Sequence, residues 1–362
     1  MARDIEQRIK PREFSVFAGL DVDKKRIAAT FSDHEGVLAS VQMAYSSHQL
    51  VNYLRKHCCN DTVALAYEVG PTGFGLYDDL EAAGYRCLVV APSMVPSAPG
   101  KRVKTNRLDS KKLSVALRGG QLQSVHVPPG IYRELRHLVQ LRDSHVRQMT
   151  ASKFRIKALL LYEGIAFPEI PGNGQWTRAV LKSIATLACK DSVRFKLNSL
   201  LATLAFHKEE TLASSRQIRK FCEQEEELRQ SIKYLCTVPG IGWITASHVV
   251  ARIGDWRLLH SPDQIAGFLG LVSSEHSTGD RVERGSITRS GDSRLRNKLI
   301  QAAWTAIRKD EELHEFYRRI YNRHPRQIAS RKAIVAVARK LTTRIYAVLK
   351  EQRPFEPRPL SN

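Results

Sequence analysis

The fold of the N-terminal part of this chain is decided by residues 14–40, FSVFAGLDVDKKRIAATFSDHEGVLAS. Its apolar runs break at 23–25 and again at Gly36, which predicts a hairpin of two short strands joined by a turn at 23–25, with Gly36 closing a second turn. Further along we expect helices over 47–57 and 73–83, and strands over 63–68 and 85–90. Strands that alternate with helices predict an α/β layer domain with some parallel strands, whose ligands gather at strand ends.

The chain carries a large excess of positive charge. Its 362 residues include 57 Lys plus Arg against 36 Asp plus Glu, a formal net charge of +21. The excess is strongest over residues 281–353, which hold nineteen Lys or Arg against seven Asp or Glu. A polyanionic partner is therefore expected, and this stretch is the place where phosphate should bind.

Cysteine spacing and hydropathy exclude some classes of protein. The six cysteines form no CxxC pair, so neither a zinc site nor a disulfide framework is indicated. The N-terminus lacks a hydrophobic signal core, and no run approaches the roughly 18 apolar residues needed to cross a bilayer. We expect a cytoplasmic protein without a membrane partner.

The middle and the end of the chain have helical patterns. Apolar positions alternate with charges over 131–161, which predicts an antiparallel helical hairpin or a coiled-coil arm, and 179–235 is again amphipathic. The last helix is expected over 330–350. We therefore predict three domains: an α/β domain over 14–129, an all-α coiled-coil region over 130–234, and a mainly α domain over 235–353.

Two segments of the last domain carry candidate nucleic-acid contacts. Residues 238–242, VPGIG, resemble the hairpin of helix-hairpin-helix modules, in which glycines such as Gly240 and Gly242 let backbone N–H groups approach a phosphate. The alternative is a glycine C-cap between two packed helices. Residues 276–279, HSTG, form a hydroxyl-rich loop followed by arginines, which suits a nucleophile attacking a phosphate. Here the alternative is a solvated basic loop.

Three carboxylates are candidates for metal chemistry. Asp21 follows the first apolar strand, Glu68 ends the strand over 63–68, and Asp109 opens a helix expected over 109–119. Acids at strand and helix ends of one α/β layer can converge, and two-metal phosphodiester chemistry needs oxygen ligands in that arrangement. Each acid also has a structural alternative: a turn residue, a solvated strand end and a helix N-cap, respectively.

Several motifs in order and spacing resemble the insertion-sequence-110 family of bacterial transposases, including its 1111 subgroup. The N-terminal motifs are GLDVDKK (19–25), YEVGPTGFGLYDDLEAAGY (67–85) and APSMVPSAPGKRVKTNRLDSKKL (91–113). The C-terminal motifs are VPGIGWITA (238–246), GFLGLVSSEHSTGD (267–280), GSITRSGDSRLRNKLIQAAW (285–304) and KAIVAVARKL (332–341). The likeness implies a RuvC-like, ribonuclease H type fold for the first domain, and a C-terminal transposase domain that supplies a serine.

The resemblance assigns roles to individual residues. Asp21, Glu68 and Asp109 take three positions of a DEDD acidic set that holds Mg²⁺, while Asn106 occupies the remaining position, where the family usually has Asp. An amide oxygen can still bind Mg²⁺, but one negative charge is lost.

The nucleophile falls on Ser277, with Thr278 as the alternative. Two further serines, Ser286 and Ser290, are better suited to helix capping or phosphate binding. The implied phosphate ligands are Arg281, Arg284, Arg289, Arg294 and Arg296, of which at least two have an alternative role as solvated arginines.

The resemblance further implies a DNA transposase or recombinase in which Ser277 attacks a DNA phosphate. It implies a homodimer formed through the arm over 131–161, a tetramer on two DNA sites, and an element-encoded guide RNA. The alternatives from the residues are a water-using RuvC-like nuclease and a nucleic-acid-binding relic without catalysis, the latter motivated by Asn106. An actin-like or sugar-kinase ATPase lacks support, because no DxGGT-like second phosphate loop is present.

Overall fold

The computed structural model describes residues 8–96, 106–169, 176–278 and 281–357, and for 106, 276–278 and 281–284 it describes the backbone only. The chain divides into two compact units, Met1–Val127 and Pro128–Asn362. Each unit has its own hydrophobic core, so each is described by itself.

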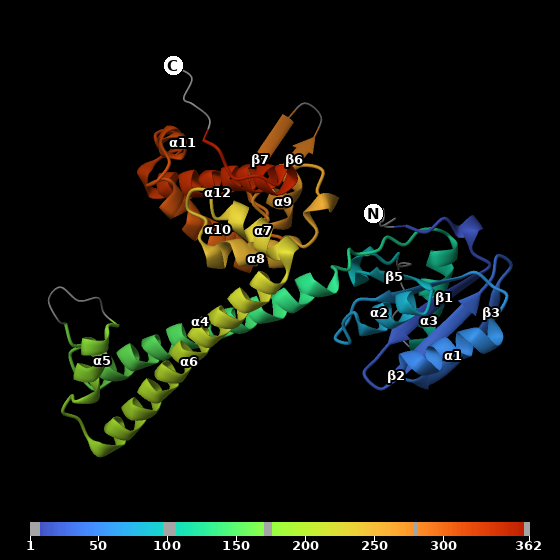
Figure 1. The fold of residues 1–362 in the computed structure, drawn as a ribbon, viewed down its shortest axis with the longest axis horizontal. Coiled ribbons are helices and arrows are strands. Elements are labelled where there is room, and N and C mark those ends of the chain that lie inside the picture. The colour runs from blue at the N-terminus through green and yellow to red at the C-terminus, as the bar shows by residue number, and fades with distance from the viewer. Residues whose placement is uncertain (1–7, 97–105, 170–175, 279–280, 358–362) are drawn as a thin grey trace. The chain divides into compact units, whose positions relative to one another are not determined.

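The first unit is built on a mixed five-stranded sheet (Figure 1). Its spatial order is β3-β2-β1-β4-β5; β1, β2 and β3 pair antiparallel, whereas β4 runs parallel to both β1 and β5. The strands are β1 (Val16–Val22), β2 (Arg26–Ser32), β3 (Val37–Ala44), β4 (Val63–Glu68) and β5 (Arg86–Val90). Because β1, β4 and β5 are parallel, their carboxyl ends lie at one edge of the sheet.

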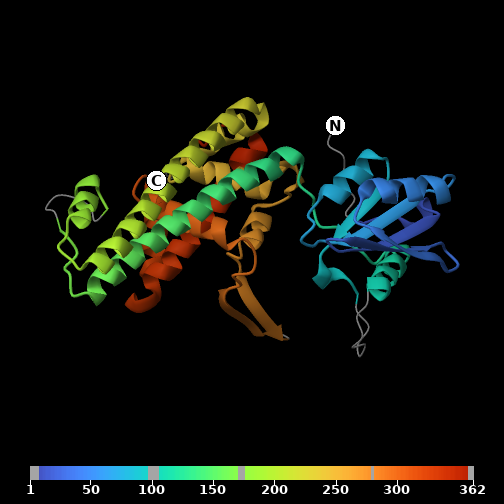
Figure 2. The same cartoon turned by 90° about the horizontal axis from the view of Figure 1, so that it is seen from below.

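Helices cover both faces of this sheet (Figure 2). On one face, α1 (Ser47–His57) and α2 (Gly75–Ala82) bury apolar side chains against residues such as Leu20 and Leu65. On the other face, α3 (Asn106–Arg118) packs Leu113 and Leu117 against Phe17. Two short 3₁₀ turns, η1 (Pro11–Glu13) and η2 (Pro92–Met94), complete this unit's described elements. Burial of these large apolar side chains stabilises the fold by about 1.5–3 kcal/mol each.

The second unit begins with a long helical hairpin. α4 (Gly130–Tyr162) and α6 (Asp191–Gln224) run antiparallel, and the short α5 (Arg178–Ala185) lies at the far end (Figure 1). At that end Ile156 and Leu160 pack with Ile184 and Leu197 in a separate cluster. Residues 131–161, expected as a helical hairpin or a coiled-coil arm, form one continuous helix that pairs with α6. The second helical stretch, expected as 179–235, is divided into α5, α6 and α7 (Glu226–Leu235).

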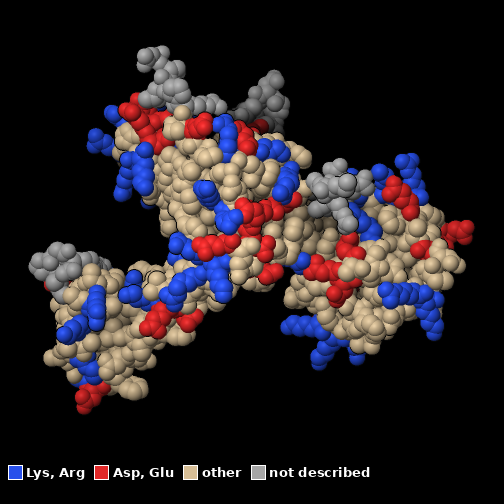
Figure 3. Space-filling view, in the orientation of Figure 1, with Lys and Arg blue, Asp and Glu red and all other residues tan. Residues whose placement is uncertain are grey.

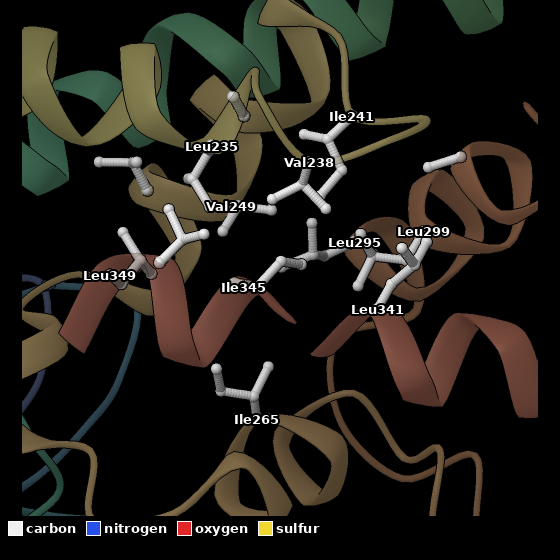
Figure 4. Close-up of a cluster of buried hydrophobic side chains, with 14 of the residues drawn as sticks. Leu235, Val238, Ile241, Val249, Ile265, Leu295, Leu299, Leu341, Ile345 and Leu349 are labelled. Carbon is white, nitrogen blue, oxygen red and sulfur yellow. The ribbon is translucent and has the colours of Figure 1, made fainter. Parts of the chain in front are cut away.

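The rest of the second unit is a set of helices packed against the apolar face of the long helix α12. Figure 4 shows side chains of α12, among them Leu341, Ile345 and Leu349, lying against residues of the surrounding helices. Those elements are α7, α8 (Trp243–Ile253), α9 (Pro262–Phe268), α10 (Ser293–Ala306), α11 (Glu311–Tyr321), α12 (Arg326–Glu351) and the 3₁₀ turn η3 (Trp256–Leu258). Across the described ranges, no helix is both long and apolar enough to cross a membrane.

One prediction for this unit was wrong. Residues 276–279 were expected as a loop, but 276–278 belong to a strand, β6 (Ser273–Thr278), which pairs antiparallel with β7 (Arg281–Ile287). Its serines, threonine and charges suggested a solvated loop, but pairing between neighbouring segments satisfies the backbone hydrogen bonds of both strands. The C-terminal part is still mostly helical.

A largely buried polar cluster of Asp143, His248 and Lys298 ties the hairpin to the helical core. Asp143 of α4 accepts a hydrogen bond from Lys298 Nζ of α10 (2.9 Å), and its other oxygen lies 3.1 Å from His248 Nε2 of α8, off the line of a hydrogen bond. Burial by itself raises the pKa of Asp143, but the contacts with His248 and Lys298 outweigh burial and hold that pKa well below its usual range.

This cluster predicts acid sensitivity. The folded-state pKa of Asp143 is depressed, so its stabilisation is present above the unfolded pKa of about 3.9 and is lost as pH falls toward the folded value. Asp143→Asn should lower the free energy of unfolding by about 3 kcal/mol at pH 7 and flatten its decline below pH ~4. Urea titrations at several pH values measure this. Asp263→Asn, at an exposed ion pair with Arg339, should cost less than about 1 kcal/mol; equal losses would contradict the account.

Candidate functional site

Two of the predicted acids, Asp21 and Glu68, lie at the same edge and on the same face of the sheet. Leu20 of β1 pairs with Tyr67 of β4 in parallel register, and Asp21 and Glu68 are the next residues on the two strands. Side chains alternate along a strand, so Asp21 shares a face with Phe17, and Glu68 shares a face with Ala66. Phe17 and Ala66 both belong to the core beneath α3. Both carboxylates therefore lie on the α3 side.

The third acid is brought to this edge by an unusually close contact between α3 and β1. A Cβ atom on Gly19 would lie only 2.1 Å from the Ser110 carbonyl oxygen and 2.3 Å from the Ser114 nitrogen. Glycine in the middle of this strand therefore lets the helix backbone rest on the strand. Asp109, next to Ser110 in the first turn of α3, is thereby held at the carboxyl edge.

Small hydroxyl side chains fix the position of α3 on the sheet. Ser110 Oγ lies 2.8 Å from Thr30 Oγ1, and Ser114 Oγ lies 2.6 Å from Ser32 Oγ. Ser114 also donates to the Phe17 carbonyl oxygen at 2.9 Å. All four hydroxyl side chains are buried, so their loss would leave polar atoms without partners. The register of α3 on β1 and β2 is therefore specified by hydrogen bonds as well as by packing.

The pKa of Asp21 reflects the negative charges near it. Burial raises the pKa of Asp21, and the negative charges of Asp109, Glu68 and Asp23 raise it further, in that order. Asp23 has a separate role, because it accepts the Lys24 N–H at 2.6 Å in the turn between β1 and β2. Mutual repulsion at Asp21 is the condition that a bound cation would relieve.

The three predicted acids offer the type of ligand atom that a hard divalent cation prefers. Carboxylate oxygens are the ligands that Mg²⁺ and Mn²⁺ prefer, and Asp21, Glu68 and Asp109 supply them from one edge. Among the residues described, no three His, Cys, Asp or Glu side chains are close enough together to hold a metal ion by themselves. Asn106 is the first residue of α3, but its side chain lies outside the described set. Asp21, Glu68 and Asp109 thus lie toward one edge of the sheet without forming a closed set of ligands for one ion.

The predicted nucleophile lies in the second unit. Ser277 is in β6, paired with Val282 of β7, and Thr278 ends β6 opposite Arg281. Gly279, quoted with them in the sequence motif, lies outside the described residues. Arg284 is also on β7, paired with Glu275. The structure therefore places both candidate hydroxyl residues and two predicted phosphate ligands on one two-stranded hairpin.

The remaining predicted arginines differ in environment. Arg289 is exposed and has a left-handed backbone (φ 55°), and Arg294 is exposed on α10. Arg296 corrects the prediction: it is only 9% exposed and donates to the carbonyl oxygens of Leu269 (2.7 Å) and Arg289 (3.2 Å). Arg296 therefore ties the segment between β7 and α10, through the Arg289 carbonyl, to the C-cap of α9, through the Leu269 carbonyl.

Two smaller predictions are also decided by the structure. The N-cap of α10 is Asp292, which accepts the Leu295 N–H, so neither Ser286 nor Ser290 caps this helix. Gly240 has φ +84°, and a Cβ there would lie 2.3 Å from the Ala302 carbonyl oxygen of α10. The need for glycine at 240 is thus explained by helix packing, the structural alternative, whereas Gly242 at the N-cap of α8 faces open space.

The raised pKa of Asp21 generates a test. Its folded-state pKa exceeds the unfolded one, so ionised Asp21 destabilises the folded protein. This destabilisation is absent below about pH 3.9 and fully present above the folded pKa. Without divalent cations, Asp21→Asn should therefore raise the free energy of unfolding at pH 7 and leave it unchanged near pH 3. Denaturant titrations measure both. Asp79→Asn, on the exposed side of α2, should show no such gain; a less stable Asp21→Asn protein at pH 7 would refute this electrostatic account.

Comparisons with known proteins match two segments of the chain, the first of which extends beyond the first unit and through α4. Residues 18–163 match the DEDD transposase model of the IS110 type, and residues 232–318 match the model described as transposase IS116/IS110/IS902 family. The first match contains all three carboxylates, and the second contains Ser277.

Individual relatives point the same way. A putative transposase, y4qE of Sinorhizobium fredii, is 34% identical over 244 residues, which are 67% of this chain and 58% of that protein. The transposase of IS1111A from Coxiella burnetii is 25% identical over 70% of this chain and 69% of its own length. A pilin gene-inverting protein of Moraxella bovis is 31% identical over 39% and 44%, respectively. The aligned part is thus less than two thirds of the first relative. The chain belongs to the IS116/IS110/IS902 family of transposases.

Proposed function

We propose that this protein is a DNA transposase that excises and inserts a mobile element, and that its first unit has a RuvC-like, ribonuclease H type fold. The observation that supports the proposal best is the convergence of Asp21, Glu68 and Asp109 at one sheet edge. The strand order β3-β2-β1-β4-β5, with one antiparallel and one parallel neighbour for β1, suits that fold. The gene-inverting relative also acts in DNA rearrangement, by its name.

In the proposed chemistry, Ser277 is the nucleophile. Its hydroxyl oxygen forms a bond to a DNA phosphorus atom as the bond from phosphorus to one deoxyribose oxygen breaks. The serine proton goes to a base or to water, and the leaving oxygen takes up a proton. Resealing reverses these changes with a hydroxyl end of another strand, so no external energy source is required.

The carboxylates would hold Mg²⁺, with Asn106 as a neutral oxygen donor at the edge of the site. Bound there, the metal supplies positive charge to the phosphate and lowers the pKa of the attacking hydroxyl. Asp21, Glu68 and Asp109 orient the ion, while Arg281, Arg284, Arg289 and Arg294 neutralise phosphate charge along the DNA strand. Thr278 is the alternative nucleophile, because it adjoins Ser277 on the same strand.

The site is composite, because the carboxylates belong to the first unit and the serine to the second. We propose that the two halves meet across protomers in a homodimer, which assembles to a tetramer on two DNA sites. The helical arm supports this: the described surface of α4 and α6 exposes large apolar side chains, which suits association between copies. These are Leu141, Phe154, Leu161, Phe195, Phe206 and Leu212.

An element-encoded guide RNA is the proposed source of target choice. A net charge of +21 supports binding of polyanions beyond one DNA site. Such a protein acts where the chromosome lies, in the bacterial cytoplasm at the nucleoid. The second candidate function, a binding relic without catalysis, is motivated by Asn106, which removes one charge from the metal set. A water-using nuclease would share the carboxylates but would not need Ser277.

The serine mechanism can be tested by recombination between donor and target plasmids in cells that carry the full element with its flanks. Ser277→Ala should lower recombination by at least about 10³-fold, because the bond to phosphorus cannot form. Asp21→Ala should have a similar effect. Ser192→Ala, at an exposed serine near the start of α6, is the matched control and should retain activity.

Three outcomes separate the candidates. If Thr278→Ala abolishes recombination and Ser277→Ala retains it, the nucleophile is Thr278 instead of Ser277. Retention of DNA cleavage in both single variants and in their double variant indicates water as the nucleophile and contradicts the serine mechanism. Inactivity of the natural protein, with recovery in Asn106→Asp, identifies a relic disabled at one metal ligand.

A further inference from the structure

Three aromatic side chains form a ladder on the surface of the second unit, away from the hairpin that carries Ser277. Trp304 of α10 remains 38% exposed, although tryptophan is usually well buried. Its ring centroid lies 5.9 Å from that of Tyr317 on α11, which in turn lies 5.9 Å from that of Tyr321. Tyr317 and Tyr321 are stacked, with 29° between their planes. The ladder therefore presents ring faces and edges over two helices.

Trp304 also belongs to a stripe of polar and basic residues along one face of α10. Residues spaced alternately by three and four positions share one helix face. In α10 and the turn after it this spacing gives exposed residues that are basic, amide or aromatic, with no acid among them. They are Arg294, Asn297, Gln301, Trp304 and Arg308. The apolar side chains of α10, such as Leu299, face the core instead.

The surroundings of the ladder are strongly positive. Residues 293–332 contain eleven Lys or Arg against four Asp or Glu. Two of those acids are already neutralised from α12: Arg344 binds both Asp310 and Glu312, and Lys340 also binds Glu312. Exposed arginines remain on α11, on the turn that follows it and at the start of α12, including Arg318, Arg323 and Arg326, respectively. Figure 3 shows basic side chains projecting from the α11 end of the unit.

We propose that this surface, the Trp304 platform (Trp304, Tyr317, Tyr321 and the α10 stripe), binds an unpaired segment of DNA. Bases stack on the aromatic rings, the arginines contact the phosphates between them, and Asn297 and Gln301 supply hydrogen bonds. Aromatic rings interleaved with cations are the arrangement by which proteins hold single strands without sequence preference.

The chemistry of the surface excludes the two nearest alternatives. A duplex hides its base faces, so exposed rings would add nothing to duplex binding. A protein partner would need acidic groups to match this charge, whereas phosphate supplies them at every nucleotide. The choice of DNA over RNA rests on the proposed function, because strand exchange separates DNA strands beside the cleaved phosphate.

The test is fluorescence anisotropy with a labelled 12-nucleotide DNA strand of mixed sequence, the matching duplex, and an RNA strand of the same sequence. Magnesium is omitted, so binding is measured without cleavage, and failure of the serine mechanism does not affect the result. Trp304→Ala should weaken binding of the single DNA strand by roughly 5- to 150-fold, the range for loss of one stacked base. Duplex binding should change less than about twofold.

Three companion variants sharpen the result. Trp304→Phe keeps a ring face and should retain most of the affinity. Tyr162→Ala, at a tyrosine 87% exposed on α4, removes an aromatic side chain elsewhere and should have no effect. Arg308→Gln should reduce the slope of log affinity against log salt by about 0.7 for the single strand, as expected for one lost phosphate contact.

Several results would overturn the proposal. Unchanged single-strand binding in Trp304→Ala, or an equal loss for duplex and single strand, would show that the rings do not stack on bases. Tighter binding of the RNA strand by tenfold or more would reject DNA as the occupant. A change of oligomeric state in Trp304→Ala, measured by light scattering, would make the platform an interface between copies.

Discussion

The candidate metal site depends on one close contact, the approach of α3 to β1 at Gly19. With any larger residue there, a Cβ would overlap the backbone at Ser110 and Ser114, so the helix would have to move outward. Asp109 adjoins Ser110, and therefore its distance from Asp21 is set by this contact. The buried hydroxyls of Thr30 and Ser32 fix the helix along the strands as well. The carboxylate cluster is thus a consequence of how tightly helix and sheet pack.

The cost of this arrangement is visible in the raised pKa of Asp21, which burial and then three neighbouring negative charges produce. Sites that hold cations commonly keep such repulsion in the unliganded protein, since the ion then contributes both binding and stability. A carboxylate of the second unit has the opposite pKa shift. Asp143 is largely buried, but it is paired with Lys298 and His248, and its pKa is lowered. Asp21 thus keeps unfavourable neighbours, whereas Asp143 joins three helices.

Much of the first unit was predictable from the sequence because its patterns are local. The helix over 47–57 and the strand over 63–68 have the predicted bounds, and Asp21 and Glu68 follow from the ends of apolar strands. The start of α3 at Asn106 and the role of Gly19 were missed. The contact between Gly19 and α3 joins residues far apart in the sequence, and the available signal was an isolated glycine within a strand pattern. The β6–β7 hairpin was missed because hydroxyl and charged residues obscured strand pairing. Arg296 looked like its neighbours in sequence, but only the fold shows that it is buried.

The central claim, that packing at Gly19 assembles a divalent-metal site from β1, β4 and α3, is most directly tested by iron-mediated cleavage. Fe²⁺ bound in place of the natural ion, with ascorbate and peroxide, cuts the backbone next to its ligands, and mass spectrometry maps the cuts. The account predicts cuts near Asp21, Glu68 and Asp109 that excess Mg²⁺ suppresses, and their loss in Gly19→Ala protein that circular dichroism shows to be folded. Cuts elsewhere, or an unchanged pattern in folded Gly19→Ala, would contradict it.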